Sequence, residues 1–384
     1  MRRSIKYQLT AVFLSLLMVL SGTAMKAEAS PEQSSQATGD LQTQITETAR
    51  GLRLTLDGKD EKILNQPKLL PAGSSLSDWA AFALALSGEK DAYASYEKEL
   101  KDYVKKQYEQ NGSLSDRKAT EYHRIILTVL ALGEDPKDFG GYDLIKDGTY
   151  NYQGDDLGMQ GVNGWIFALI ALDASGAQVP EDARYTKEQI KDSILKEQNE
   201  DGSFGLMPGT SDPDLTSMAL QALAPDYDTD LKVQDAADQA LGWLSGHMTE
   251  TGSFESYGAE SAESCAQAVI ALTALGIDPA SDERFTKNGV NLLDGLKRFK
   301  RDNGGYAHTV DDSESNFMAT EQVLMAQVAL QKYENGQGSL YDFTDYKGPS
   351  QSGNYAVPVI AATLTIAAGA GVWMIFRKRG KTHA

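Results

Sequence analysis

The chain has 384 residues, one cysteine and a formal net charge of −18, with 36 Lys and Arg against 54 Asp and Glu. A single cysteine excludes an internal disulfide, so stability must come from an apolar core, and a chain of this length is long enough to build one. The acidic excess excludes nucleic acid as a partner, because binding to a phosphate backbone needs the opposite charge.

The first residues have the layout of a secretory signal. Arg2, Arg3 and Lys6 precede the apolar run Ala11–Leu20, and small residues end the segment at Ala29. This order predicts a signal peptide over residues 1–29, followed by a linker over residues 30–38. An exported protein with so little cysteine is more typical of a bacterial surface than of animal secretion.

Six tripeptides of one type then punctuate the chain. They are Gly-Ser-Leu at 112–114 and 338–340, Gly-Thr-Tyr at 148–150, Gly-Ser-Phe at 202–204 and 252–254, and Gly-Gly-Tyr at 304–306. In the middle of the chain they recur roughly every 50 residues, as expected when each repeat is one pair of helices. Since one pair cannot bury its apolar face alone, the pairs must stack or close into a ring.

Each tripeptide occupies the same place in its repeat. The glycine follows a helix, where a left-handed backbone conformation favours it, and an aromatic residue or Leu comes two residues later. We expect side chains such as Phe204 and Phe254 to fold back as apolar plugs. The plugs hold the helix pairs together and are not expected to touch a ligand.

Two kinds of helix alternate along the chain. One kind is apolar almost all round, which indicates burial, and the other is amphipathic. The predicted inner helices are Leu76–Ser87, Ala119–Leu132, Gln160–Leu172, Pro213–Leu223, Ser261–Leu275 and Asn316–Lys332. The predicted outer helices are Leu41–Leu54, Ala92–Glu109, Asp138–Ile145, Thr186–Glu197, Lys232–His247 and Thr286–Arg301. Six pairs of this kind predict an all-α (α/α)6 toroid over residues 39–343.

The C-terminal part has the pattern of a membrane anchor. Residues 344–355 form a linker rich in Gly, Ser and Pro, and residues 356–376 carry no charge and are long enough to span a bilayer. The basic tail 377–384 follows at once, which predicts a cytoplasmic C-terminus and an extracellular toroid. Membrane retention is favoured over wall attachment, because no Leu-Pro-x-Thr-Gly motif precedes the span. We expect a monomer.

The repeats carry a family resemblance. Gln198-x3-Gly202-x-Phe204 resembles the repeat of squalene and terpenoid cyclases and of protein prenyltransferase β subunits, and Glu263–Pro279 is similar to its form in bacterial surface proteins. The resemblance spans about residues 40–340 and implies the toroid more strongly than any chemistry, since the superfamily also holds the alpha domain of cobalamin carriers. Cobalamin is therefore a ligand that the resemblance suggests, although those carriers close their site with a second, β-rich domain.

The catalytic signatures of these relatives are incomplete. Asp212-Pro-Asp214-Leu lacks the last acid of the Asp-x-Asp-Asp cluster that proton-initiated cyclases need, and neither Asp155-Asp156 nor Asp311-Asp312 continues to Asp-Asp-x-x-Asp. These carboxylates are interpreted as loop residues and helix caps. We accordingly expect no catalytic residue, although the chain remains open to an enzymatic interpretation.

One motif invites comparison with a zinc site. Glu263-Ser-Cys265 with His308 invites comparison with the Asp-x-Cys pair and distant His of protein prenyltransferases. Glu replaces Asp, and His308 precedes the last inner helix instead of lying within it. Cys265 is therefore interpreted as a small buried residue, and no metal or cofactor is expected. A thioester is excluded, because Cys265-Ala-Gln-Ala does not match Cys-Gly-Glu-Gln.

Polar residues at the starts of the inner helices form the candidate ligand site. In a toroid these starts converge on one mouth, and a polar and aromatic basin is the usual form of a small-molecule site. The candidate ligand-binding residues are Asp78, Trp79, Glu121, His123, Asn163, Trp165, Asp214, Thr216, Glu263, Gln267 and Asn316. Any one of the acids, such as Asp78, Asp214 or Glu263, would serve equally well as a helix cap or first-turn charge.

Two functions remain open at this point. The first is a membrane-tethered extracellular protein, non-catalytic, that captures a small ligand or a surface protein in the mouth of the toroid. The second is an enzyme on isoprenoid or glycan substrates, because (α/α)6 rings also host glycosidases and lyases that use paired carboxylates.

Overall fold

The computed structural model describes residues 31–349. The predicted signal peptide, the predicted membrane span 356–376 and the basic tail lie outside the described residues. Within residues 31–349, none of the helices combines the length and the apolar character needed to cross a membrane.

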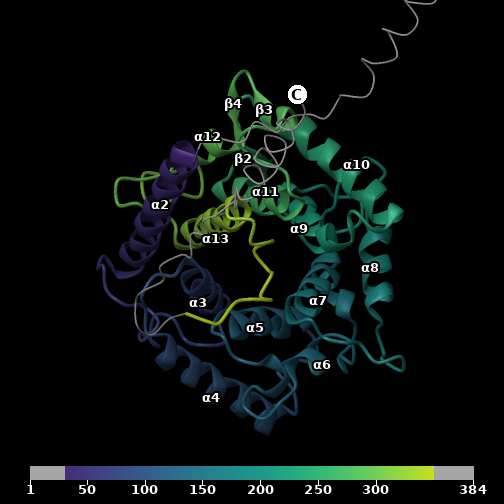
Figure 1. The fold of residues 1–384 in the computed structure, drawn as a ribbon. Helices are drawn as coiled ribbons and strands as arrows, with labels where there is room; N and C mark the ends of the chain where they lie inside the picture. Colours follow the sequence, from purple (N-terminus) through teal and green to yellow (C-terminus); the bar gives the residue numbers. More distant parts are fainter. Residues whose placement is uncertain (1–30, 350–384) are drawn as a thin grey trace, which may run out of the picture. The chain divides into compact units, whose positions relative to one another are not determined.

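Two concentric sets of helices form a closed ring (Figure 1). The inner helices are α3 (Ser75–Ser87), α5 (Ala119–Ala131), α7 (Val162–Ser175), α9 (Pro213–Leu223), α11 (Ala262–Ala274) and α13 (Phe317–Glu334). The outer helices are α2 (Pro31–Asp57), α4 (Tyr93–Asn111), α6 (Leu144–Gly148), α8 (Lys187–Lys196), α10 (Leu231–His247) and α12 (Leu292–Lys297). Each inner helix contacts the next, and α13 returns to α3, so the predicted all-α toroid is confirmed.

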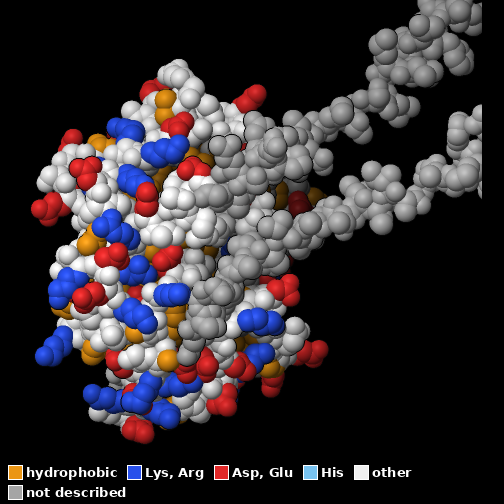
Figure 2. Space-filling view, turned by 60° about the vertical axis from the view of Figure 1, so that its left-hand side comes forward, with side chains coloured by type: hydrophobic (Ala, Val, Ile, Leu, Met, Phe, Trp, Pro, Cys, Tyr) orange, Lys and Arg blue, Asp and Glu red, His pale blue; other side chains and the backbone are white. Residues whose placement is uncertain are grey.

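The inner helices are buried because their side chains are small and apolar on every face. In α3, Ala80, Ala81 and Ala83 are fully buried on both sides of Phe82. Alanine combines high helix propensity with a small side chain, which lets neighbouring helices approach closely. The outer helices leave charged faces in solvent, and acidic and basic side chains are interspersed on the face in Figure 2.

Two of the outer helices are shorter than predicted. Where a helix was predicted over Asp138–Ile145, the chain ends the single turn η1 (Pro136–Asp138) and forms an extended bridge from Phe139 to Tyr142 before α6 begins. Between 286 and 301 it forms the hairpin β3 (Thr286–Lys287) and β4 (Val290–Asn291) before the short α12. A second hairpin, β1 (Glu255–Ser256) and β2 (Ala259–Glu260), precedes α11, and further single turns are η2 (Leu157–Gln160), η3 (Ala224–Asp226) and η4 (Glu283–Phe285).

The apolar plugs are buried as predicted. Phe204 and Phe254 have no exposed surface, and Tyr306 is 2% exposed. The backbone at each plug is tied to the next inner helix: Thr216 Oγ1 accepts from the Phe204 amide at 3.0 Å, and Thr320 Oγ1 accepts from the Tyr306 amide at 2.9 Å. Each plug therefore fixes the loop that leads into the following inner helix.

Glycines form the closest contacts between successive repeats. A Cβ at Gly295 in α12 would lie 1.8 Å from the carbonyl oxygen of Gly252, the glycine of the tripeptide before it. The same contact recurs where the ring closes, since a Cβ at Gly51 in α2 would lie 2.2 Å from the amide nitrogen of Gly305. No side chain fits at these backbone crossings, so the repeats require glycine there.

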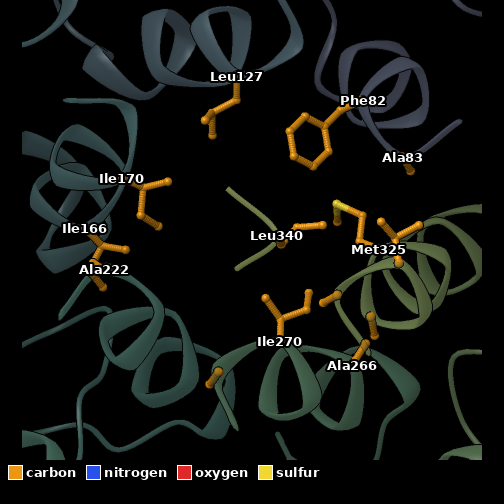
Figure 3. Packing of buried hydrophobic residues seen from close by; sticks show 14 of the residues in the cluster. Phe82, Ala83, Leu127, Ile166, Ile170, Ala222, Ala266, Ile270, Met325 and Leu340 are labelled. Carbon is orange, nitrogen blue, oxygen red and sulfur yellow. The ribbon is translucent and has the colours of Figure 1, made fainter. Parts of the chain in front are cut away.

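The chain after α13 returns through the centre of the ring. We call residues 339–348 the bore segment. Its Leu340 is fully buried, and the inner helices surround it (Figure 3). The side chains labelled around it are Phe82, Leu127, Ile166, Ile170, Ala222, Ala266, Ile270 and Met325.

Polar contacts hold the bore segment against the ring. The Tyr346 hydroxyl, within the predicted linker 344–355, donates to the carbonyl oxygens of Ala85 at 3.1 Å and Ala131 at 2.9 Å. Lys332 Nζ donates to the Asp342 carbonyl at 2.7 Å. The centre of the toroid is thus filled by the protein's own chain.

Candidate functional site

The starts of the inner helices share one end of the ring. Arg124 Nε donates to Asp78 Oδ2 at 2.8 Å near the starts of α5 and α3, and Thr120 Oγ1 donates to Gln160 Oε1 at 2.7 Å between α5 and the approach to α7. Tyr346 bonds the opposite, C-terminal ends of α3 and α5. The starts of α3 and α5 therefore lie on the side of the ring away from Tyr346, where the sequence places the mouth.

On the α3 and α5 side of the mouth, the charges are paired. Besides Arg124, Asp78 Oδ1 accepts from the Gly73 amide at 2.9 Å and from the Tyr96 hydroxyl. Arg124 Nη2 also donates to Glu121 Oε2 at 2.5 Å. Burial raises the pKa of Asp78, and the Arg124 charge opposes that rise. With its oxygens engaged, Asp78 fixes the loop at Gly73 and the position of Arg124.

Three acidic residues stand near the starts of α9, α11 and α13. We call Asp214, Glu263 and Glu321 the acidic cluster; each lies near the start of its inner helix. Glu263 is 4% exposed and Glu321 is 3% exposed. His308, in the loop before α13, is a neighbour of the cluster, and its Nδ1 lies 2.9 Å from Glu263 Oε2.

Burial shifts the titration of this cluster. Desolvation raises the pKa of Asp214 to about 6, and the nearby carboxylates of Asp212 and Glu263 add to the rise. The pKa of Glu321 lies well above its usual range, first because the side chain is buried and second because Glu263 is beside it. Two acids of the cluster therefore favour the protonated form more than ordinary carboxyl groups do.

Several oxygens of the cluster have no partner. Asp214 Oδ1 and Glu263 Oε1 are buried and make no hydrogen bond, and neither does Ser217 Oγ, one turn after Asp214 on α9. Buried polar atoms without partners are costly and rare, so this side of the mouth has free capacity to accept hydrogen bonds.

A chain of amide groups links the mouth to the bore segment. Gln267 Nε2 donates to Gln322 Oε1 at 2.9 Å, and Gln221 Nε2 donates to Gln267 Oε1 at 2.9 Å. The Tyr341 hydroxyl then donates to Gln221 Oε1 at 3.3 Å. Residues from α13, α11 and α9 are connected in this way to the chain that fills the bore.

An apolar hollow of about 400 Å³ lies beside the starts of α7 and α9. Trp165 lines it together with Leu206 and Met207, and Met207 is 65% exposed. Trp165 also packs edge to face on Tyr185, with the ring centroids 5.7 Å apart. This surface can take an apolar part of a molecule.

In the structure, two of the candidate residues have partners within the protein's own fold. His123 was expected in the basin, but it is fully buried and its Nε2 lies 2.7 Å from the Gly148 carbonyl in α6, so it faces the outer ring. Burial lowers its pKa to about 4. Thr216 was also expected there, but its hydroxyl is used by the Phe204 plug and by the Asp212 carbonyl, at 2.8 Å.

The remaining candidates stand at the helix starts. Trp79 is half-buried and packs on Phe82 and Phe167, with centroid distances of 5.5 and 5.8 Å. Asn163 is half-buried near the start of α7. Asn316 is the N-cap of α13, and its side chain accepts from the Ala319 amide at 3.1 Å. The caps of α9 and α11 are Asp212 and Ser261, so neither Asp214 nor Glu263 serves as an N-cap.

Two of the three residues in the candidate zinc motif lie together. Glu263 and His308 meet, whereas Cys265 is fully buried, and burial raises the pKa of its thiol to about 12. In residues 31–349, no group of three or more His, Cys, Asp and Glu side chains is arranged to hold a metal ion.

Sequence reasoning missed Glu321 and Arg124. Both are charged residues inside helices that are otherwise buried, and an ionisable residue among apolar neighbours is the signal that could have found them. The contacts of Tyr341 with the mouth network depend on the path of the bore segment, which no local pattern indicates.

Comparison with known proteins supports the fold. No family model matches the chain, and no curated protein matches its sequence. Among solved structures, Candida albicans protein geranylgeranyltransferase-I, in complex with GGPP, superposes with a TM-score of 0.51 at 10% identity, over 76% of this chain and 92% of that one. Unsaturated glucuronyl hydrolase from Bacillus sp. GL1 superposes with a TM-score of 0.50 at 12% identity, over 81% of this chain and 100% of that one.

At such low identity, these similarities establish the fold alone. The chain has the α/α toroid fold, shared by a protein prenyltransferase and a glycan hydrolase. Its chemistry has to be argued from its own residues.

Proposed function

We propose that this toroid is a binding protein that captures a small polar ligand at its mouth without converting it. One observation carries the proposal: Asp214 and Glu263 present buried oxygens with no hydrogen-bond partner, at the place where three inner helices begin. A ligand with several hydrogen-bond donors would satisfy these atoms. The oxygens are already removed from water in the empty protein, so a ligand that bonds to them does not have to meet the free-energy cost of desolvating them.

The filled bore supports a ligand at the mouth over one in the centre of the ring. A long isoprenoid chain needs an apolar cavity, and Leu340 occupies the apolar centre. Binding there would first have to displace the bore segment, with the loss of the Tyr341 and Tyr346 hydrogen bonds. The hollow beside Trp165 offers apolar surface near the mouth without such a loss. Cobalamin, suggested by the resemblance, is included as a candidate ligand.

The proposal is tested by identifying what the full-length protein carries. We expect mass spectrometry of small molecules released by denaturation to find a polar compound enriched with the wild type. The compound should be lost with Glu263→Gln and retained with Glu109→Gln, which makes the same charge change on the exposed end of α4. Equal recovery from both variants would move the site away from the acidic cluster.

A second candidate is hydrolysis of a glycan, and the pKa differences within the acidic cluster favour it. Glycoside hydrolysis uses one protonated and one ionised carboxyl group. Burial raises the pKa of Asp214 to about 6, and it holds the pKa of Glu321 well above its usual range. Release of reducing ends from glycosaminoglycan oligosaccharides, abolished by Asp214→Asn, would favour this candidate over capture.

We also propose that the ring is tethered outside the cell membrane, which rests on the sequence of residues 356–384. Protease added to intact cells should degrade the ring, while a tag placed after Ala384 should stay protected. Recovery of the whole protein from the medium, with none in the membrane fraction, would contradict the tether.

A further inference from the structure

We infer that the loops leading into α7, α9 and α11 form a docking surface for a protein segment that carries Lys or Arg beside apolar side chains. We call residues 149–161, 197–212 and 248–261 the approach loops; each ends directly before one of these inner helices. A macromolecule would bind this surface from outside the ring, so the surface goes beyond the capture of a small ligand.

Two contacts join the approach loops into one surface. A Cβ placed at Gly161 would lie 2.3 Å from the Leu206 carbonyl oxygen, so the loops before α7 and α9 touch through their backbones. Ser256 Oγ, in the hairpin before α11, donates to Asp212 Oδ2, in the loop before α9, at 2.9 Å. The exposed side chains of the three loops are therefore presented side by side.

Large apolar side chains are exposed on all three approach loops. Met159, Leu206 and Met207 are 52%, 45% and 65% exposed, and they line the hollow of about 400 Å³ beside Trp165. Tyr257, in the turn between β1 and β2, is 97% exposed. Single exposed apolar residues are ordinary, but a group of them around a hollow is typical of an interaction site. Methionine and aromatic residues are enriched at protein interfaces, where flexible Met side chains adapt to the partner.

The charge of the approach loops identifies the chemistry of the partner. Residues 149–161, 197–212 and 248–261 contain two, four and three acidic residues, respectively, and no Lys or Arg. Glu197, which lines the hollow, and Glu255, beside the exposed Tyr257 turn, both have exposed side chains. A negative surface of this kind repels an acidic partner and attracts a basic one.

Three cations from neighbouring elements reach the approach loops. Arg298 Nη1 pairs with Glu260 Oε2 at 2.7 Å. Arg184 Nη1 donates to the Tyr152 carbonyl at 2.7 Å, and Lys287 Nζ donates to the Met248 carbonyl. Two of the three cations are thus bound to backbone oxygens, and one of the nine acidic side chains is paired with them.

The acidic and apolar surface is confined to one part of the ring. The loops before α3, α5 and α13 each contain basic residues, such as Lys62, Lys118 and Arg301. A lipid surface does not fit the approach loops, because membranes carry negative charge and would be repelled by them. A protein segment with both basic and apolar side chains complements the exposed acids and the hollow together.

The test titrates the full-length protein with a short synthetic peptide in which Lys and Leu alternate. We expect it to bind at least tenfold more tightly than two matched peptides, one with Glu in place of Lys and one with Ser in place of Leu. Added salt should weaken the binding, because exposed charges are screened. Fluorescence anisotropy of the labelled peptides measures these affinities.

Two pairs of variants locate the docking surface. Met207→Ser should weaken binding of the Lys-Leu peptide at least tenfold, whereas Leu231→Ser, at an 82% exposed position on α10, should preserve it. Glu197→Gln combined with Glu255→Gln should also weaken it at least tenfold. The matched control removes the same charge from two other exposed positions, Glu61 and Glu109, and should leave the affinity unchanged. Circular dichroism checks that every variant is folded.

Other outcomes overturn the inference. Equal binding of the Lys-Leu and Glu-Leu peptides would refute a basic partner, and equal affinities of Met207→Ser and Leu231→Ser would place the peptide elsewhere. Binding to phosphatidylcholine vesicles, or self-association in sedimentation, that is lost with Met207→Ser would assign the surface to a membrane or to a second copy instead. If the protein binds none of the peptides but still releases a compound that Glu263→Gln loses, the docking surface is refuted and capture of a small ligand stands.

Discussion

At the scale of single residues, position along the repeat decides what a side chain does. The residue two places after the tripeptide glycine enters the core, as Phe254 does, whereas Tyr257, three residues later in the turn between β1 and β2, is 97% exposed. The two aromatic residues thus differ almost completely in the surface they bury, although they are close in sequence. Their substitutions should differ accordingly.

We expect Phe254→Ala to lower the free energy of unfolding by about 3–5 kcal/mol, because it removes a fully buried aromatic ring and leaves a cavity. Tyr257→Ala is the matched control and should change stability by no more than about 0.5 kcal/mol. Urea denaturation followed by circular dichroism measures both values. Equal midpoints for Phe254→Ala and the wild type would refute the role of the plugs.

The raised pKa of Asp214 predicts that the free energy of unfolding depends on pH. Its pKa is about 6 in the folded protein and near 3.8 when unfolded, so between these values the folded state holds a proton that the unfolded state has lost. Stability from this group is therefore present at pH 4 and declines as the pH rises to 6, by up to about 3 kcal/mol. Asp214→Asn should match the wild type at pH 4 and exceed it at pH 7.

Denaturation midpoints of both proteins between pH 4 and 7.5 provide the measurement. The difference between the two curves isolates Asp214 from the other buried acids, Asp78 and Glu321, whose pKa values are also raised. A constant difference over the whole range would mean that Asp214 does not titrate in it.

At the scale of elements, the inner helices were predicted to within three residues at each end. Their apolar character on every face is a strong signal, because it fits only buried helices. The predicted bounds of two outer helices were wrong. In each of them, residues with positive φ, Gly140-Gly141 and Asn288-Gly289, turn the chain back in a tight turn. Asn-Gly is the usual sequence of such a hairpin, so that signal was present but was outweighed by helical spacing.

Contacts between repeats predict opposite effects for two glycines in outer helices. Gly295→Ala should destabilise by at least 1–3 kcal/mol, roughly the cost of overpacking, since its Cβ would overlap the Gly252 carbonyl oxygen. Gly242→Ala in α10 meets no atom within 4 Å and should stabilise by up to about 1 kcal/mol through helix propensity. Thermal unfolding should give Tm shifts of opposite sign; shifts of the same sign would contradict the backbone contact between repeats.

At the scale of the whole molecule, the sequence predicted the ring and the convergence of helix starts, but not what fills the centre. The tripeptide at 338–340 indicated another apolar plug, and Leu340 is indeed buried, yet its surroundings exist only once α3 and α13 meet. The acidic cluster was predicted in part. Asp214 and Glu263 stand in the first turns of their helices, where the sequence pattern indicates them, whereas Glu321 lies one turn further into α13 and was not among the predicted site residues.

Because the Leu340 side chain contacts the ring from its centre, we expect its removal to destabilise all inner helices together. Leu340→Ala should lower the free energy of unfolding by about 2–5 kcal/mol, since the void would be lined by side chains such as Phe82, Ile270 and Met325 that cannot all move inward. The control Leu231→Ala, at an 82% exposed position, should have little effect.

Tryptophan fluorescence and circular dichroism should follow one shifted transition, because Trp79, Trp165 and Trp243 lie in different repeats of one ring. Separation of the two signals into distinct transitions would mean that the repeats unfold independently, and the bore segment would then not be the element that joins them.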